Sequence, residues 1–520
     1  MNFWIVSREC AGIAEAGGVK DVTCALSETL SKLKHNVTLF IPLYGCTDLS
    51  LIKEFNCAYK NPIFVEVENT SVPVSFAYGK FDDFNVIFVC HQRFYQKKAV
   101  YTYTKEEEEL DFNHKTGQGH KDVHFLNTLF QKSVAQYFKL CSKEEIPDVI
   151  HCQDAPAALL PAFVENFKST DKAAASFYKN TKMVVTIHNA GPAYHHEFAN
   201  LGEAAFYTSL PKNMLVEGLN GYRVEPFLIA SLYSTITTVS PQYAKEIMSC
   251  STDTDGLAEG FSARNTVIKG ITNGFDFDRY DPEDTKKSCL PFAFNPKTLD
   301  LNGKYLCRED FLNDYYELNH IYVDGIKQNG FIEAEKDAVY ICYHGRVVTQ
   351  KGIEVMADAC KIILNKNLNV RFIFMGQGDP SLEKILIEMA EQNPGKVLYL
   401  QGYDKVLSRM VVAVSDFSLH PSHFEPCGLE DFVSQTYGTL PIAHSVGGLM
   451  KIQEDKTGFL YSPNTSEKLA EIILSLVEMR KNMGTGYFER RIQYASQYIN
   501  DVYNWTNVVE NEYMKLYKNL

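Results

Sequence analysis

Short runs of apolar residues recur along the chain and alternate with longer segments of helical periodicity. The runs lie, in chain order, at residues 2–6, 37–41, 149–151, 184–187, 236–239, 338–342, 370–374 and 397–400. Strands that are apolar on both faces are typical of parallel sheets covered by helices on both sides. The pattern therefore predicts an α/β fold built on parallel sheets.

The alternation is interrupted once, between about residue 278 and residue 336, where Pro282, Pro291 and Pro296 occur. A chain of 520 residues is also too long to fold around one core. We therefore expect two large domains, with a hinge near Ile271 and a second sheet that starts at Ala338.

Composition places the chain among globular proteins, with 45% apolar and 22% charged residues. The net charge of -13 argues against a nucleic-acid partner or an anionic membrane surface, although a local basic pocket could still hold a small anion. No stretch reaches the ~20 apolar residues of a membrane span. The charge run at residues 105–109 is expected to be a solvated loop or the start of a helix.

Cysteine usage and the first residues indicate a cytoplasmic protein. The 13 cysteines are scattered and form no C-x-x-C pair, which indicates reduced thiols rather than disulfides or a zinc site. The apolar run at residues 2–6 has no basic lead and is too short for a signal peptide, so we expect a buried first strand there.

In parallel sheets the functional site lies at the carboxyl ends of the strands, so the residues after each strand are the candidates. Residues 417–422 resemble a strand that ends in a loop, and Glu425 follows in the segment Glu-Pro-Cys-Gly-Leu at 425–429. Glu425 could accept hydrogen bonds from ligand hydroxyls, while the N–H groups after Gly428 could bind a phosphate. The alternative is that Glu425 only caps a helix that starts near Gly428.

Two cations follow another predicted strand. Arg346 and Lys351 stand five residues apart before a helix. Such a pair suits a diphosphate leaving group, whose developing charge it would stabilise, although two surface cations would give the same pattern. The glycine turn at Gly376 lacks a full G-x-G-x-x-G motif and is a weak nucleotide signal.

The first half offers weaker signals of the same kind. His188 follows a buried strand and could contact substrate, although a lone histidine is more often structural. Gly17 and Gly18, after the first strand, allow a ligand to approach the backbone, but two glycines alone usually mean a turn.

Taken together and in order, these segments resemble one family, the bacterial glycogen synthases and plant starch synthases. The matching segments span nearly the whole chain and lie at residues 237–243, 271–276, 350–352, 425–429, 437–442 and 447–449. Members are retaining glucosyltransferases of the GT-B fold, in which two Rossmann-like domains have parallel sheets facing a central cleft. The resemblance implies an N-terminal acceptor-side domain at residues 1–268, a nucleotide-sugar-binding domain at 269–499, and a C-terminal helix at 500–520 that returns to the first domain.

The resemblance also implies roles for residues. Arg346 and Lys351 would bind the diphosphate of the donor, Glu425 would hold sugar hydroxyls, and His188 would bond the transferred glucose with Asp154 nearby. The remaining residues that the resemblance assigns to donor binding are Glu15, Gly17, Gly18, Asp21, Asn189, Asn273, Gly376, Tyr403, Cys427, Gly428, Leu429 and Thr439.

The implied reaction is the transfer of glucose from ADP-glucose to the non-reducing end of an α-1,4-glucan, with retention and without a metal or other cofactor. Two further hypotheses stay open. One is a related glucosyltransferase that uses UDP-glucose or another acceptor, and the other is a non-catalytic glucan-binding homologue.

Three departures from the family pattern bear on that choice. Glu15 stands where the family's first loop has a lysine, and an anion there would repel a donor diphosphate. The family segment His-x-His-Asp-Trp-His is reduced to His-Cys-Gln-Asp-Ala-Pro at residues 151–156. Glu430 and Asp431 replace a Thr-Gln pair after Leu429.

Overall fold

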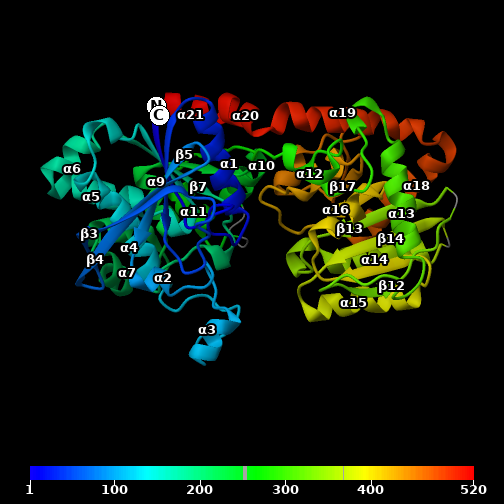
Figure 1. The fold of residues 1–520 in the computed structure, drawn as a ribbon, viewed down its shortest axis with the longest axis horizontal. Coiled ribbons are helices and arrows are strands. Elements are labelled where there is room, and N and C mark those ends of the chain that lie inside the picture. The colour runs from blue at the N-terminus through cyan, green and yellow to red at the C-terminus, as the bar shows by residue number, and fades with distance from the viewer. Residues whose placement is uncertain (250–253, 336, 367) are drawn as a thin grey trace. The chain divides into compact units, whose positions relative to one another are not determined.

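The computed structural model describes residues 1–249, 254–335, 337–366 and 368–520, without the side chains of residues 58–61. The chain forms two compact units (Figure 1). The first unit comprises Met1–Asn273 and Val508–Leu520, and the second comprises Gly274–Asn507. Each unit is an α/β layer structure around its own sheet, as the apolar runs predicted.

The unit boundaries lie a few residues after the positions expected at 268/269 and 499/500. Ile271 still belongs to the first unit because its N–H donates to the carbonyl of Thr238, 2.8 Å away. Phe275 belongs to the second unit because its N–H donates to the carbonyl of Tyr503, also 2.8 Å away. Tyr503 is the last residue of α19 (Gly486–Tyr503), so this helix extends past the expected boundary.

The first sheet has nine strands in the order β11-β10-β7-β6-β1-β2-β5-β4-β3. Its strands, in chain order, are β1 (Asn2–Val6), β2 (Asn36–Pro42), β3 (Lys53–Val67), β4 (Thr70–Phe81), β5 (Phe84–Cys90), β6 (Val149–Gln153), β7 (Lys182–Ile187), β10 (Thr235–Thr238) and β11 (Ile268–Gly270). All neighbours from β11 to β5 pair in parallel. The strand order reverses beside β1, which creates a switch point between β1 and β6.

One edge of this sheet departs from the all-parallel expectation. β4 pairs antiparallel with both β3 and β5. The apolar runs did not predict this antiparallel meander, because exposed and buried residues alternate along β4. Such alternation is typical of a strand with one solvated face.

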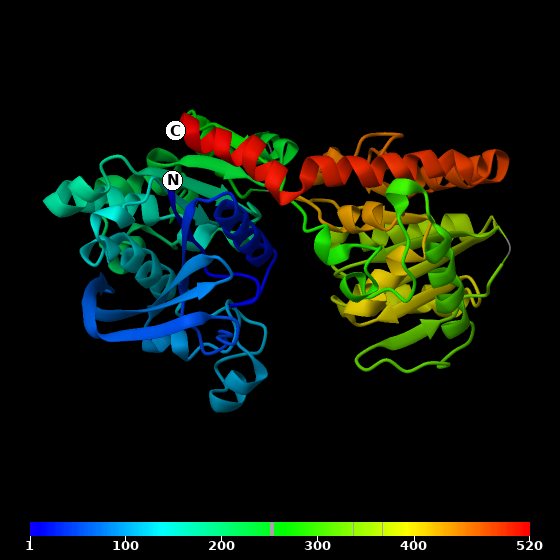
Figure 2. The same ribbon diagram turned by 45° about the horizontal axis from the view of Figure 1, so that its top comes forward.

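Helices cover the first sheet. They are α1 (Val19–Lys32), α2 (Gln92–Tyr95), α3 (Lys105–Leu110), α4 (Val123–Gln136), α5 (Leu160–Thr170), α6 (Lys172–Phe177), α7 (Leu201–Thr208), α8 (Lys212–Leu215), α9 (Pro226–Tyr233), α10 (Pro241–Ser249), α11 (Leu257–Ala263), the end of α20 (Trp505–Val508) and α21 (Met514–Asn519). The C-terminal helical segment packs beside β1, where the rings of Phe3 and Tyr517 lie 5.0 Å apart, and both termini lie in this unit (Figure 2).

The second sheet has seven strands in the order β12-β15-β14-β13-β16-β17-β18. They are β12 (Lys327–Gly330), β13 (Val339–His344), β14 (Val370–Gly376), β15 (Val397–Gln401), β16 (Phe417–His420), β17 (Leu440–His444) and β18 (Phe459–Tyr461). Only the edge strand β12 is antiparallel among them. The six parallel strands have the doubly wound Rossmann order, with the switch point between β13 and β16.

The helices of the second unit lie on both faces of this sheet. They are α12 (Thr285–Ser288), α13 (Asn302–Asp314), α14 (Ile353–Leu364), α15 (Pro380–Gln392), α16 (Lys405–Ala413), α17 (Glu430–Thr436), α18 (Ser466–Met483) and α19. Two hydrophobic clusters form the core, one on each face, as the nearly continuous apolar strands require.

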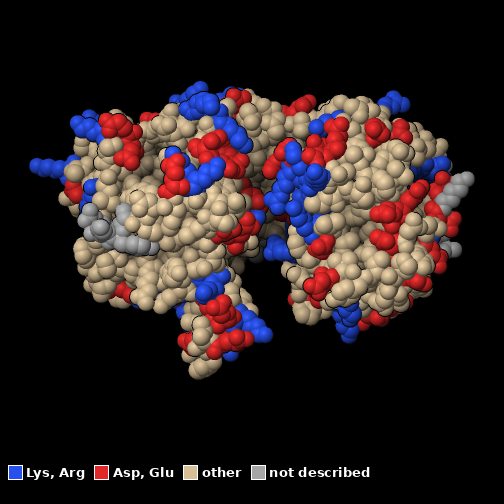
Figure 3. Space-filling view, viewed as in Figure 1, with Lys and Arg blue, Asp and Glu red and all other residues tan. Residues whose placement is uncertain are grey.

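Although the net charge is -13, the surface is not uniformly acidic. Figure 3 shows acidic and basic residues interspersed on the visible face of each unit, with Lys and Arg gathered over α12 and α16. The charge run at residues 105–109 forms α3, which projects from the first unit and starts at a capping box between Thr104 and Glu107.

Two further expectations concern cysteines and membranes. All cysteines within the described residues are free, while Cys250 lies outside them. Within the same part of the chain, no helix has the length and apolar character needed to cross a bilayer.

Candidate active site

Each unit carries a polar cluster at the carboxyl ends of its parallel strands, at or next to the switch point. We call the residues around Lys351 and Glu425 the second-unit cluster, and the residues around Asp154 and His188 the first-unit cluster. The loops after β13 and β16 supply the second-unit cluster, because these adjacent parallel strands end at the same edge of the sheet. Gly352 lets the two loops touch, since a Cβ there would lie 2.0 Å from the carbonyl oxygen of Pro421.

The centre of the second-unit cluster is an ion pair between Lys351 and Glu425. Nζ of Lys351 lies 2.6 Å from Oε2 of Glu425, and the two side chains are only 12% and 11% exposed. The hydroxyl of Ser422 donates to the same carboxylate oxygen at 3.0 Å. Because Lys351 ends the short helical turn Thr349–Lys351, its side chain is set against the strand-end loop that carries Glu425.

Glu425 does not cap the following helix. α17 begins at Glu430, two residues later than expected, and no side chain of the described residues caps it at Leu429. The carboxylate of Glu425 instead faces Lys351 and Ser422. The alternative of a purely capping role is therefore wrong.

The two cations of the sequence pattern have different environments. Lys351 is largely buried and paired, whereas Arg346 is exposed and its guanidinium donates to Oε1 of Gln350 at 3.3 Å. Gln350 in turn donates to the carbonyl of Phe424, 3.0 Å away. Arg346 is thus held next to the Glu425 loop with its charge open to solvent, as binding of an anion requires.

Glu430 places a second carboxylate beside Lys351. Burial alone would lower the pKa of Lys351, but the negative charges of Glu425 and Glu430 raise it above its ordinary value. Lys351, in turn, lowers the pKa of Glu430 to about 2 against the effect of burial. The Glu430 carboxylate also accepts the N–H of Leu429 at 3.2 Å, so an amide expected to meet phosphate already has an acceptor.

A buried lysine holds the turn at residues 427–428. Nζ of Lys451 donates to the carbonyls of Cys427 and Gly428, at 2.7 and 2.8 Å, and pairs with Asp431 at 2.9 Å. Burial raises the pKa of Asp431 to about 6, although Lys451 acts in the opposite direction. Gly448 is required next to this turn, since a Cβ there would lie 2.0 Å from the carbonyl oxygen of Cys427.

The other residues of the second unit that are predicted to bind the donor differ in their environments. Gly376 ends β14, where a Cβ would collide with the carbonyl oxygen of Gly345, and Tyr403 is 68% exposed after β15. Thr439 is fully buried, and its hydroxyl accepts from Nζ of Lys304 at 2.9 Å and donates to the carbonyl of Val412 at 2.7 Å. The Thr439 hydroxyl is therefore a core contact in this structure, and its assignment to donor binding stays a prediction.

In the first unit, Glu9 organises the glycine loop. Its Oε2 atom accepts the N–H groups of Ala16 and Gly17 at 3.1 and 2.6 Å. Burial raises the pKa of Glu9, while these amide bonds oppose the rise. Glu15 lies exposed in the same loop and accepts the N–H of Gly12 at 2.7 Å, so this anion has a local partner.

Asp154 and His188 meet at the ends of the adjacent strands β6 and β7. Oδ1 of Asp154 accepts the N–H of His188 at 3.2 Å, and Nε2 of His188 lies 2.8 Å from the amide oxygen of Gln153. Burial raises the pKa of Asp154 to about 7 and lowers the pKa of His188 to about 3. At neutral pH His188 is therefore an uncharged hydrogen-bonding group, and Asp154 titrates near 7.

The backbone at Asp154 is strained. Its φ of 63° and ψ of -179° fall in a region that is essentially restricted to glycine. Such a conformation costs roughly 1–3 kcal/mol and recurs where a side chain must be held in one place. This strain supports a functional role for Asp154 over a merely structural one.

The remaining predicted residues of the first unit lie around this cluster or near the loop. Asn189 accepts the N–H of Gly191 at 2.8 Å, and Asp21 pairs with Lys20 at 2.8 Å in the first turn of α1. Gly18 caps that helix. Asn273 is 5% exposed, and its Oδ1 atom has no hydrogen-bond partner among the described residues.

Sequence reasoning missed three residues of the two clusters, namely Glu9, Ser422 and Lys451. Glu9 and Ser422 lie in the loops after β1 and β16, so the rule that selected Glu425 could have selected them as well. Lys451 gives no such signal, because it reaches the turn at 427–428 from a separate segment.

The architecture defines the class of protein. Two Rossmann-like units, each with a polar cluster at the carboxyl ends of its parallel strands, form a glycosyltransferase of the GT-B fold. The fold resembles that of the catalytic domain of starch synthase IV from Arabidopsis thaliana, which was solved bound to ADP and acarbose. The TM-score is 0.79 at 22% identity, over 100% of this chain and 99% of that chain.

The chain belongs to the family of the starch synthase catalytic domain, whose description matches residues 2–262, half of the chain. Residues 326–495 match the glycosyl transferases of group 1. Glycogen synthase of Thermodesulfovibrio yellowstonii is 29% identical over 100% of this chain and 98% of its own length. Glycogen synthase of Elusimicrobium minutum is 28% identical over 100% and 99%. The family expected from the motifs is thereby confirmed.

Proposed function

We propose that this protein is a glycogen (starch) synthase, which transfers glucose from ADP-glucose to the non-reducing end of an α-1,4-glucan with retention. The observation that carries the proposal is the buried pair of Lys351 and Glu425 at the switch point, with Arg346 exposed beside it. Full-length similarity to two glycogen synthases, and a fold like that of a starch synthase solved with ADP and acarbose, support it.

The second-unit cluster supplies the chemistry that a nucleotide-sugar donor needs. Lys351 and Arg346 provide positive charge for the diphosphate as its bond to the sugar breaks. Because Lys351 already neutralises Glu425, the carboxylate can lie close to the diphosphate and accept hydrogen bonds from sugar hydroxyls. Protein cations can therefore perform the charge stabilisation that a metal performs in other transferases, and we propose that transfer needs no added metal.

The first-unit cluster supplies hydrogen bonds rather than charge. His188 is neutral at pH 7 because burial lowers its pKa to about 3. Since its Nε2–H donates to the amide oxygen of Gln153, its Nδ1 can accept a hydrogen bond from a glucose hydroxyl without adding a cation. Asp154 fixes the backbone of His188 through the 3.2 Å bond to its N–H. We assign His188 to glucose binding and Asp154 to holding it in place.

A related glucosyltransferase that binds its donor differently is the second candidate, and one observation favours it. Glu430 puts an additional carboxylate beside Lys351, and its pKa near 2 keeps it charged at neutral pH. This lowers the positive potential that a diphosphate would meet at Lys351. Because ADP-glucose and UDP-glucose carry the same diphosphate, this loss does not choose between the two bases. It favours a transferase that relies more on contacts to the base or the sugar of its donor.

The decisive experiment gives the protein glycogen and ADP-, UDP- or GDP-glucose in parallel, with EDTA and without added metal. We expect glucan extension with ADP-glucose. Extension with UDP-glucose alone would support the second candidate. If no donor extends the glucan while the folded protein still binds it, the chain is a non-catalytic glucan-binding homologue.

Substitutions then test the assigned roles. Glu425→Ala and Lys351→Ala should each lower kcat at least about 100-fold, the usual effect of losing a group that acts on transition-state charge. Lys384→Ala is the matched control, because Lys384 also pairs with a glutamate, Glu388, but on the exposed face of α15 at 3.7 Å. Activity of Glu425→Ala close to that of the wild type would reject the role of Glu425.

A further inference from the structure

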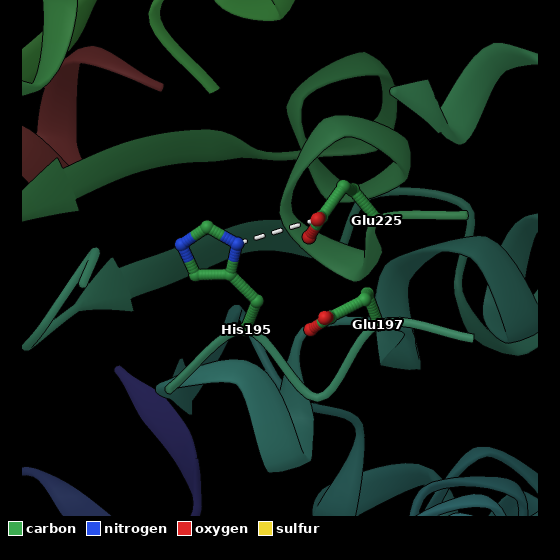
Figure 4. Close-up of side chains that lie close together, drawn as sticks. All are labelled: His195, Glu197 and Glu225. Carbon is green, nitrogen blue, oxygen red and sulfur yellow. Dashed lines mark hydrogen bonds and ion pairs between the residues drawn. The ribbon is translucent and has the colours of Figure 1, made fainter. Parts of the chain in front are cut away.

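Three side chains outside both clusters, His195, Glu197 and Glu225, lie close together (Figure 4). His195 lies directly after the helical turn Pro192–Tyr194, Glu197 follows two residues later, and Glu225 directly precedes α9. One ligand atom from each residue lies within 4.8 Å of the other two. His195 and Glu225 have side chains with no exposed surface, whereas Glu197 is 25% exposed.

The hydrogen bonds of His195 require a cation beside its ring. Nε2 lies 2.8 Å from the carbonyl oxygen of Ala190, which can only accept, so Nε2 carries the hydrogen. Nδ1 lies 3.3 Å from Oε1 of Glu225, which also only accepts. A neutral imidazole would therefore present its Nδ1 lone pair to a carboxylate, and a proton or a metal ion is needed between them.

The second oxygen of Glu225 gives an independent observation. Oε2 of Glu225 is buried and has no hydrogen-bond partner among the residues that the structure describes. An unpaired buried acceptor costs roughly 1–3 kcal/mol, and more when it is charged. A second proton on His195 would satisfy only Oε1, whereas a metal ion between the residues could satisfy both carboxylate oxygens.

Glu197 completes the set from the more exposed side. Its Oε1 atom lies 3.3 Å from the guanidinium of Arg223, which binds Asp255 more closely at 2.6 Å. Because Asp255 retains the guanidinium, the Glu197 carboxylate can turn towards His195 without leaving Arg223 uncompensated.

We propose that His195, Glu197 and Glu225 bind one divalent transition-metal cation of the Zn²⁺ or Mn²⁺ class. One imidazole nitrogen and two carboxylates are donors that such cations accept. The 3.3 Å between Nδ1 and Oε1 is the spacing of two ligands that each lie about 2.0–2.2 Å from one metal. The bond from Nε2 to the Ala190 carbonyl is the outer contact that usually orients a metal-binding histidine.

The cation would stabilise the conformation of the first-unit cluster and would take no part in sugar transfer. It would connect the segment after β7 to the start of α9, and Ala190 lies two residues beyond His188. The site thus would fix the loop that carries His188 and Asn189. This role is independent of the proposed function, since a protein without transferase activity could still bind the cation.

Cobalt absorption is the most direct test, because free cysteines within the described residues could also bind transition metals. The full chain is treated with EDTA, dialysed and titrated with Co²⁺, followed by displacement with Zn²⁺. We expect one equivalent with d–d bands and no thiolate charge-transfer band, because the donors are nitrogen and oxygen. Zn²⁺ should also raise the melting temperature.

Three variants make the result specific. Glu225→Gln and Glu197→Gln should weaken Co²⁺ binding by at least roughly 10- to 100-fold. Glu197 is partly exposed, so this second variant remains informative if Glu225→Gln does not fold. Glu317→Gln is the control, since Glu317 also pairs with a histidine at 3.3 Å, but on the exposed surface beside His320.

Two results would overturn the proposal. One is the absence of Co²⁺ binding in the folded wild-type chain, which would mean that a proton alone lies between His195 and Glu225. The other is binding with a thiolate band that persists unchanged in both glutamine variants, which would assign the metal to cysteines.

Discussion

Replacing Lys351 by Met would remove a cation that acts electrostatically on both Glu425 and Glu430 while keeping most of the side-chain volume. Nζ of Lys351 lies 2.6 Å from Glu425, and both side chains are nearly buried. The variant would leave two carboxylates close together without their common partner. Either one carboxylate takes up a proton in the folded state, or the loop at residues 421–429 opens.

The magnitude follows from the titration of Glu430. Its pKa is about 2 in the folded chain against an ordinary value of 4.5, with Lys351 as the main cause. At about 1.4 kcal/mol per pH unit, this difference corresponds to about 3 kcal/mol. Removing one partner of a buried ion pair costs a similar amount, about 3–5 kcal/mol. We expect Lys351→Met to lower the free energy of unfolding of the second unit by about 3 kcal/mol at pH 7.

The loss should depend on pH with a defined sign. In the wild type the low pKa of Glu430 contributes stability that is present above pH 4.5 and is lost as the pH falls towards 2. In the variant, a carboxyl that keeps its proton has a raised pKa in the folded state, so it stabilises at low pH and loses that effect as the pH rises. The difference between wild type and variant should therefore shrink from pH 7 to pH 5.

The chain offers a reporter for this measurement. It has 2 tryptophans, Trp4 in the first unit and Trp505 in the second. In a Trp4→Phe background, urea unfolding followed by fluorescence therefore reports the second unit. Adding Glu430→Gln to Lys351→Met should recover about half of the loss, because one uncompensated charge disappears.

The exposed pair of Lys384 and Glu388 provides the control, since Lys384→Met should change stability by less than about 1 kcal/mol. A Lys351→Met chain as stable as the wild type at pH 7 would refute the reasoning. So would a loss of equal size at pH 5 and pH 7.

Three further predictions concern the framework of the two units. Tyr517→Phe should lower the free energy of unfolding of the first unit by about 1 kcal/mol, because the Tyr517 hydroxyl lies 2.8 Å from Nδ1 of the buried His151. Thermal unfolding of the variant tests this prediction. Lowering the pH from 7 to 5 should lower the melting temperature, because five largely buried histidines must stay neutral in the folded chain. Burial reduces the pKa of His120, His151, His188, His196 and His420 to about 3, while the unfolded side chains take up protons near 6.5. The raised pKa values of Asp154 and Asp431 act in the opposite direction but involve fewer groups, and a flat profile would contradict the prediction. Gly448→Ala should destabilise the second unit by about 1–3 kcal/mol, because the added Cβ would lie 2.0 Å from the Cys427 carbonyl oxygen. An unchanged midpoint of urea unfolding would contradict this prediction.

The sequence predicts the parallel strands and the residues at their ends because both depend on local pattern. Near-continuous apolar runs identify buried strands, and the switch-point rule then selects Lys351 and Glu425 without any structure. The antiparallel strands β3 and β4 escape this reasoning, since their alternating residues carry no long apolar run.

Other parts of the site depend on contacts that a motif does not encode. Thr439 lies within a segment that matches the family, yet its hydroxyl binds the buried Lys304, and the sequence does not distinguish a core role from a ligand role. Likewise, Glu15 is a departure in the sequence but has its own partner at Gly12 in the structure. Its effect on a donor therefore depends on whether that bond persists.

Residues 508–520 belong to the first unit, so this unit cannot finish folding until the whole chain has been synthesised. Tyr517 covers Phe3 of β1 and His151 of β6, two central strands made at the beginning and in the first third of translation. The ribosome must therefore produce the entire second unit before the last piece of the first unit emerges. Until then β1 and β6 lack this cover, and a chain that stops before Val508 leaves apolar strand surface exposed to chaperones and proteases.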